Sequence, residues 1–229
     1  MGILKPMAGA VDLISNPHAN MLNHSGDIDD GMNDAIANGN SYAVSFIYCV
    51  KSFAATLAED HVTCLEHGDK HLELTDRPTH TVHDAFWIFL DGLSAFARAR
   101  QVDSKSEKQR LIKRGKNGIR SLKKMSKTCR THTLSKLILL EAEREAVAGN
   151  HATAKQKFLH ALSLARKFEN MYEQALCDQV AGNHCITDLD QVEEGIKHLR
   201  SASGAYKAWG ALAAVTHLKG KIEKLSKKR

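Results

Sequence analysis

The stretch EAVAGNHATAKQKF, residues 145–158, decides which fold class this chain belongs to. A glycine, an asparagine and a lysine between two segments of mixed polarity fit either a phosphate-binding loop or a turn between two packed helices. A phosphate-binding loop needs a second glycine and a Lys-Ser or Lys-Thr pair after a strand, and this stretch has none of these. We therefore interpret Gly149 as the residue that ends one helix, Lys155 as solvated, and Ala154 and Phe158 as packing residues.

The residues around this turn follow a repeat spacing. Ala142, Gly149, Ala154, Phe158 and Ala161 stand seven, five, four and three residues apart. Small side chains allow two antiparallel helices to approach closely, and a phenylalanine fills the space between layers. The spacing resembles the tetratricopeptide repeat, including its Ala-x3-Phe signature. It predicts a helix–turn–helix unit at this place in the chain.

Two further units have a weaker pattern. Gly195, Leu199 and Ala202 keep the matching intervals, but Ala154 and Gly195 are 41 residues apart. The usual period of the repeat is about 34 residues. Gly92 marks an earlier unit that is weaker still. We expect a degenerate, tetratricopeptide-like array.

Helical periodicity extends over most of the chain, whereas the alternation typical of strands is essentially absent. Helices are expected near residues 25–40, 41–60, 60–74, 82–101, 132–148, 151–168, 171–187, 190–208 and from 210 onward. We predict an all-α fold, a tetratricopeptide-like array of antiparallel helix pairs (an α-solenoid), over residues 27–220. Residues 1–26 are expected to be a poorly ordered lead-in and residues 221–229 a basic tail. Trp209 is expected to seal the last repeat against the tail helix.

Composition predicts a cytoplasmic protein without a membrane span. The most apolar window, residues 42–57, is short and contains Lys51, which suits a buried helix. The first residues hold too short an apolar run for a signal peptide. The five cysteines show no C-x-x-C spacing, and reduced thiols are expected at Cys49, Cys64, Cys129, Cys177 and Cys185.

One segment makes the chain basic. Residues 105–130 hold eleven Lys and Arg and one acid, Glu107, which leaves the rest of the chain with a small net negative charge. Such a segment could bind phosphates of nucleic acid or an anionic membrane, or an acidic protein partner, but no aromatic residues interleave with the bases. An ordinary solvated helix face is the competing interpretation, and Gly115 and Gly118 could fray the helix into a loop. The candidate anion-binding residues are Lys113, Arg114, Lys116, Arg120, Lys123 and Lys124.

The sequence contains only weak candidates for metal-binding and catalytic motifs. Cys64, His67 and His71 would share one helical face as metal ligands, with a fourth donor after Pro78, yet the spacing matches no zinc module that we can defend. The run GDIDDG, residues 26–31, lacks the glycine position and the glutamate of a calcium loop. The sequence contains no nucleophile elbow, no Walker motif and no kinase signature, and it predicts no cofactor.

Roughly residues 27–220 resemble the helical-repeat region of large signalling ATPases, more specifically at the C-terminal end and loosely before residue 85. The matching features are LLEAE at residues 139–143, QAL at 174–176, AYKAWGA at 205–211 and FLDGLSAFARARQ at 89–101. Proteins of that family join an AAA-type ATPase, often preceded by a kinase-like domain, to such an array, and a GAF sensor with a histidine kinase or a cyclase follows. The resemblance implies a connector that carries no activity of its own, so this chain would be a fragment or a stand-alone relative.

Two functions follow as expectations. The first is a non-catalytic scaffold that mediates protein–protein or interdomain contacts in signal transduction, since stacked helix pairs present a surface suited to peptides or domain faces. The second is an anion-binding protein that acts through residues 105–130 on nucleic acid or acidic phospholipid. An enzyme has no support in the sequence beyond ordinary polar residues.

Overall fold

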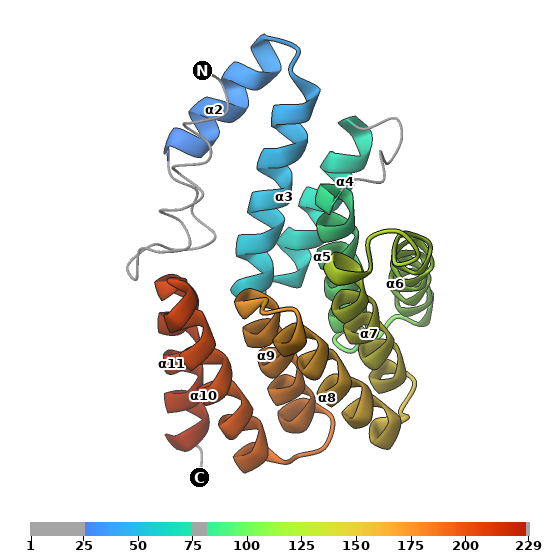
Figure 1. Cartoon of the computed structure of the whole chain (residues 1–229), viewed down its shortest axis with the longest axis vertical. Helices are drawn as coiled ribbons and strands as arrows, with labels where there is room; N and C mark the ends of the chain where they lie inside the picture. The colour runs from blue at the N-terminus through green and yellow to red at the C-terminus, as the bar shows by residue number, and fades with distance from the viewer. Residues whose placement is uncertain (1–25, 75–81, 228–229) are drawn as a thin grey trace.

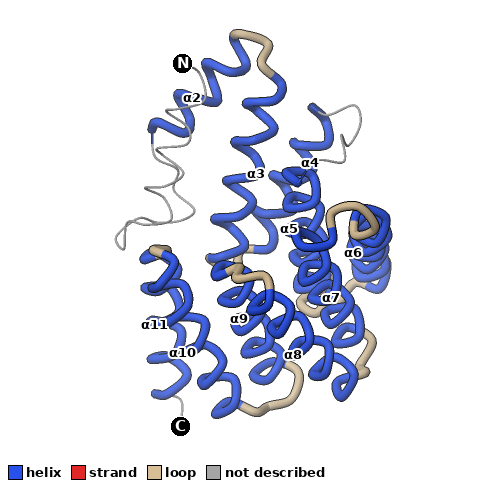
Figure 2. Tube along the Cα trace, viewed as in Figure 1, coloured by secondary structure: helices blue, strands red, loops and turns tan. Residues whose placement is uncertain are grey.

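The computed structural model describes residues 26–74 and 82–227, and these residues form ten helices and no strand (Figures 1 and 2). The all-α prediction is confirmed. The helices are α2 (Gly26–Ala37), α3 (Ser41–Leu57), α4 (His61–Leu74), α5 (Val82–Ala99), α6 (Lys105–Met125), α7 (Arg130–Val147), α8 (His151–Lys167), α9 (Met171–Thr187), α10 (Val192–Trp209) and α11 (Leu212–Lys227).

Helices that are neighbours in sequence pack as pairs. Helix α3 packs on α4, α5 on α6, α7 on α8, and α9 on α10, while α11 covers the outer side of α10 (Figure 1). Helix α7 also contacts α5 and α6, and α8 contacts α9, so one pair leads to the next. The contacts are therefore mostly between successive elements, as in an array built from helix pairs.

Five helices end in the same type of turn. The chain takes the left-handed conformation, with φ between +54° and +91°, at Gly39, Glu59, Gly149, Glu169 and Gly210. At Gly149 the amide donates to the Ala146 carbonyl at 3.0 Å, and the next amide, of Asn150, donates to the Glu145 carbonyl at 2.9 Å. This pair of bonds satisfies two carbonyls that a helix end otherwise leaves free. The stretch at residues 145–158 is thus a turn between α7 and α8.

Glycines allow two of the helix pairs to cross closely. A Cβ added to Gly195 in α10 would lie 2.8 Å from the Gly182 carbonyl oxygen of α9 and 2.4 Å from Ile186 Cγ1. A Cβ added to Gly118 in α6 would lie 3.6 Å from the Gly92 Cα of α5. The crossing at Gly195 is so close that a Cβ would clash, whereas the crossing at Gly118 would bring a Cβ into van der Waals contact.

Small and aromatic residues of the repeat pattern lie in the core. Ala142, Ala154 and Ala161 are fully buried between α7 and α8, and Phe158 is 3% exposed. Leu199 and Ala202 of α10 are also fully buried. These positions have the environment that the repeat spacing predicts.

Trp209 does not seal the end of the array as expected. Its side chain is 37% exposed, and its ring packs against Phe53 and Tyr172. Tyr206, one turn earlier in α10, is the fully buried aromatic residue, and its hydroxyl donates to Gln179 Oε1 at 2.8 Å. The hydroxyl finds a buried partner, whereas the larger indole stays at the surface.

The basic segment and the C-terminal end of the chain compare with the expectations as follows. The basic segment does not fray at its glycines, because the Phe96 ring packs on Gly115 and would lie 2.6 Å from an added Cβ. Helix α11 runs from Leu212 to Lys227 and so includes most of the basic tail expected at residues 221–229. The lead-in expected at residues 1–26 lies outside the described residues except for its last position. Within residues 26–74 and 82–227, no helix has both the length and the apolar character needed to cross a membrane.

Candidate functional site

An aromatic cluster joins four helices that are far apart in sequence. It consists of Phe53 from α3, Phe86 from α5, Tyr172 from α9 and Trp209 from α10. The ring centroid of Phe53 lies 5.1 Å from that of Phe86 and 5.9 Å from those of Tyr172 and Trp209. Phe86 and Tyr172 meet edge to face at 5.6 Å. Such geometries stabilise aromatic pairs, so the rings form one rigid surface.

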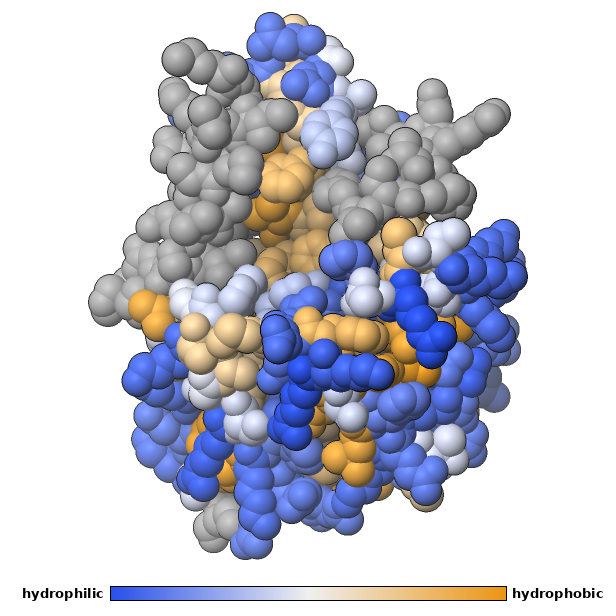
Figure 3. Space-filling view, in the orientation of Figure 1, coloured by the Kyte–Doolittle hydropathy of each residue, from blue (hydrophilic) through white to orange (hydrophobic). Residues whose placement is uncertain are grey.

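The cluster lines an open groove, which we call the aromatic groove. Its volume is about 430 Å³, and its walls are completed by His132, Lys136 and Asn170. A second hollow of about 480 Å³ adjoins it and shares His132, Asn170 and Trp209. On the face drawn in Figure 3, apolar side chains show through the middle of the view, while hydrophilic side chains cover most of the lower half. A groove of this size fits one or two large side chains of a ligand.

Buried polar groups fix the floor of the aromatic groove. The Lys136 ammonium lies 5.5 Å from the centre of the Tyr172 ring and pairs with the buried carboxylate of Glu173. That carboxylate also accepts hydrogen bonds from the Tyr172 hydroxyl at 3.0 Å and from Asn170 at 2.8 Å. Burial, together with the Glu173 charge, raises the pKa of Tyr172, so its hydroxyl remains a donor. The polar network positions the rings and leaves their apolar faces for a ligand.

The arrangement suits non-covalent binding. Aromatic rings held by packing lose little side-chain entropy when they bind, and tryptophan and tyrosine are the residues that most often dominate binding energy at protein interfaces. Trp209, which lines the groove, is 37% exposed, and Met171, which lines the adjoining hollow, is 40% exposed.

The candidate basic residues fall into two groups. Lys113, Lys116, Arg120, Lys123 and Lys124 are exposed on the outer face of α6. Arg114 is not available in the same way, because its guanidinium forms hydrogen bonds of 2.9 and 3.0 Å to Asp91 and an ion pair of 2.7 Å to Asp69. It also donates to the Leu65 carbonyl, so Arg114 ties α6 to α4 and α5.

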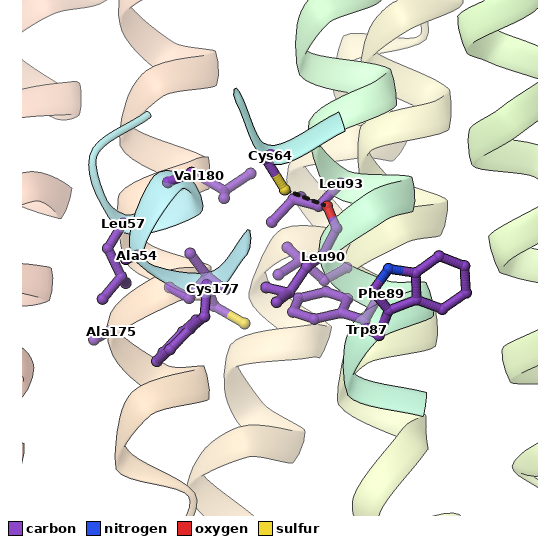
Figure 4. Close-up of a cluster of buried hydrophobic side chains, with 14 of the residues drawn as sticks. Ala54, Leu57, Cys64, Trp87, Phe89, Leu90, Leu93, Ala175, Cys177 and Val180 are labelled. Carbon is purple, nitrogen blue, oxygen red and sulfur yellow. Dashed lines mark hydrogen bonds between the residues drawn. The ribbon is translucent and has the colours of Figure 1, made fainter. Parts of the chain in front are cut away.

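The three weak metal candidates are held by other contacts. The Cys64 thiol donates to the Leu90 carbonyl at 3.8 Å (Figure 4), and burial raises the pKa of this thiol to about 11. The His71 ring stacks on Trp87 and shares a hydrogen bond with Ser45, while the His67 ring packs on Tyr48. Within the described residues, no three His, Cys, Asp or Glu side chains gather as metal ligands. The donors expected after Pro78 lie in part beyond those residues.

No local pattern in the sequence predicts the aromatic groove. Phe53 lies in the most apolar window, residues 42–57, and Trp209 is expected to seal the last repeat. Nothing local in the sequence brings Phe53, Phe86, Tyr172 and Trp209 together, because the packing of α3, α5, α9 and α10 does so. The pair Trp209-Gly210 is the local sequence signal that could have pointed to the groove. A glycine there indicates the end of the helix, and in the structure this tryptophan is exposed beside the left-handed Gly210.

Comparison of the chain with protein-family models, with curated proteins and with solved structures finds no match.

Proposed function

We propose that this chain is a non-catalytic helical scaffold of the tetratricopeptide type that binds a protein partner through the aromatic groove. The observation that carries the proposal is the set of four rings from four helices, with Trp209 left 37% exposed at its edge. A large aromatic side chain costs free energy when water contacts it, and a partner that covers it recovers that free energy.

The partner that fits is a protein segment with one large apolar or aromatic side chain. The groove offers ring faces to that side chain, and His132 and Asn170 at its margin offer hydrogen bonds to the segment's backbone. The resemblance to the connector region of signalling ATPases suggests the biological setting, in which the segment belongs to a neighbouring domain or to a separate signalling protein.

Selection from a peptide-display library tests this proposal. We expect enriched peptides to share a large apolar anchor residue and to bind with an affinity that Trp209→Ala lowers at least about tenfold, a loss of about 1.4 kcal/mol. Circular dichroism checks that the variant remains helical. Leu159→Ala is the matched control, because Leu159 is an exposed apolar residue (52%) on α8 that does not line the groove.

Two results would contradict the proposal. Peptides that bind the wild type and Trp209→Ala equally well would place the binding surface elsewhere. Failure to enrich any peptide, while the protein binds nucleic acid or acidic vesicles, would favour the second candidate function below.

The second candidate is anion binding through α6. Five of the six candidate cations are exposed on this helix and favour it, namely Lys113, Lys116, Arg120, Lys123 and Lys124. Binding of this kind weakens steeply as salt is added, because counterions are released from the nucleic acid. A quadruple Lys→Glu variant at positions 113, 116, 123 and 124 separates the two candidates, since it abolishes anion binding and leaves peptide binding in the groove intact.

A further inference from the structure

A second, polar pocket lies on another side of the array. Its volume is about 350 Å³, and it shares no lining residue with the aromatic groove. Its walls come from α5, α7, α9 and α11 and from the turn between α3 and α4, so five parts of the chain enclose it. Leu93, Ala97, Leu176 and Val180 provide apolar surface, and charged side chains face them.

One wall of this pocket is fully hydrogen-bonded. The Glu59 carboxylate accepts from Gln179 at 3.0 Å, from Asn183 at 2.7 Å and from Lys221. Burial alone would raise the pKa of Glu59, but the bond to His217 and the charge and bond of Lys221 hold that pKa well below its usual range. This wall is therefore a preformed structural network.

Another pair of lining residues, Arg100 and Glu143, leaves one donor atom and one acceptor atom without a partner. Arg100 Nη2 donates to Glu143 Oε2 at 2.7 Å, and Arg100 Nε lies 3.8 Å from Asp188 Oδ2. Within the described residues, Arg100 Nη1 and Glu143 Oε1 are both buried and have no hydrogen-bond partner. The Glu143 side chain is 0% exposed and the Arg100 side chain 18%.

Buried polar atoms without a partner are rare in folded proteins, because each costs free energy that a partner would restore. Here the two atoms belong to two side chains that are bonded to each other and that both line the pocket. A ligand that satisfies both must accept a hydrogen bond from Arg100 and donate one to Glu143. An amide edge, with N–H beside C=O, has this pair of groups.

The charge and the shape of the pocket restrict the class of ligand that it can bind. Two cations, Arg100 and Lys221, face three carboxylates, those of Glu59, Glu143 and Asp188, so an added anion would be repelled. Burial lowers the pKa of His61 to about 4, which makes this lining imidazole neutral at pH 7. The apolar lining residues suit a flat ring. We propose that this pocket binds a small uncharged heterocycle with an amide edge, of the nucleobase kind, held between Arg100 Nη1 and Glu143 Oε1.

Titration of the full chain with uracil, followed by ligand-observed NMR and calorimetry, tests the proposal. We expect saturable binding of uracil and at least about tenfold weaker binding of 1,3-dimethyluracil, which keeps the ring and both carbonyls but lacks the N–H donors. Because this comparison uses the wild-type protein, it does not depend on the folding of any variant.

A conservative variant assigns the site. Glu143→Gln keeps the shape and replaces one carboxylate oxygen by an amide nitrogen, which donates where the ligand also donates. We expect it to weaken uracil binding at least about tenfold. Glu145→Gln makes the same change two residues away on α7, where the side chain bonds Arg144 and Asn150 outside the pocket, and it should leave binding unchanged.

Three outcomes overturn the proposal. Absence of uracil binding at millimolar concentration means that water alone satisfies Arg100 and Glu143. Equal binding of uracil and 1,3-dimethyluracil means that the amide edge is not recognised. Binding of inorganic phosphate in place of uracil means that the pocket selects anions.

Discussion

Replacing Gly195 by alanine tests the close crossing of α9 and α10. The new Cβ would lie 2.8 Å from the Gly182 carbonyl oxygen and 2.4 Å from Ile186 Cγ1. Overpacking of this kind costs about 1–3 kcal/mol, and we take the upper part, about 2–3 kcal/mol, because a backbone oxygen cannot rotate away. Alanine returns about 1 kcal/mol through its better helix propensity. The net loss of unfolding free energy is therefore about 1–2 kcal/mol.

Gly204→Ala is the matched control on the same helix. Gly204 is exposed, and no atom lies within 4 Å of an added Cβ, so only the gain in propensity remains. Thermal unfolding followed by circular dichroism should show a melting temperature lowered by about 2–8 °C for Gly195→Ala and raised by about 1–4 °C for Gly204→Ala. Equal stabilisation by both substitutions would refute the close crossing.

Three further substitutions probe other parts of the fold. Glu169 holds φ +54° at a helix end, a conformation that costs a non-glycine residue about 1 kcal/mol, so Glu169→Gly should raise the unfolding free energy by about 0.5–1 kcal/mol in urea denaturation, and a loss would contradict this. Burial lowers the pKa of His61 from its ordinary value of 6.5 to about 4. Because the unfolded chain binds a proton that the folded chain does not, stability should fall by about 1–3 kcal/mol as the pH falls from 6.5 to 4, and His61→Gln should flatten that slope. Asp91→Ala removes a buried carboxylate that accepts hydrogen bonds from the half-buried Arg114 at 2.9 and 3.0 Å and should cost about 3–5 kcal/mol, whereas Asp69→Ala, at the 56%-exposed partner, should cost less than about 1 kcal/mol.

Local patterns predict the helices well. The turn at Gly149 follows from a glycine after an apolar stripe, and the burial of Ala154 and Phe158 follows from their spacing. These features depend on residues close in sequence, which is why periodicity and capping residues are sufficient to identify them.

Features that depend on packing between helices far apart in sequence could not be predicted from local patterns. Gly115 looks like a helix breaker in the sequence, yet it provides the flat place on which Phe96 packs. Arg114 looks like one of six equivalent cations, yet Asp91, 23 residues earlier, makes it structural.

The two candidate sites also depend on packing between helices far apart in sequence. The aromatic groove needs four helices and the polar pocket needs five parts of the chain, and neither leaves a contiguous motif. Arg100 and Glu143 are separated by 43 residues, so their ion pair is visible only once α5 and α7 are packed together.

The fluorescence of Trp209 provides the most direct measurement of the central claim, that the aromatic groove is where a partner binds. The chain has two tryptophans, and Trp87 is 7% exposed, so Trp87→Phe leaves Trp209 as the single emitter with a modest change in volume. Titration with a selected peptide should shift the Trp209 emission to shorter wavelength, with the same dissociation constant that peptide anisotropy gives. Peptide binding that saturates without any change in Trp209 emission would contradict the claim.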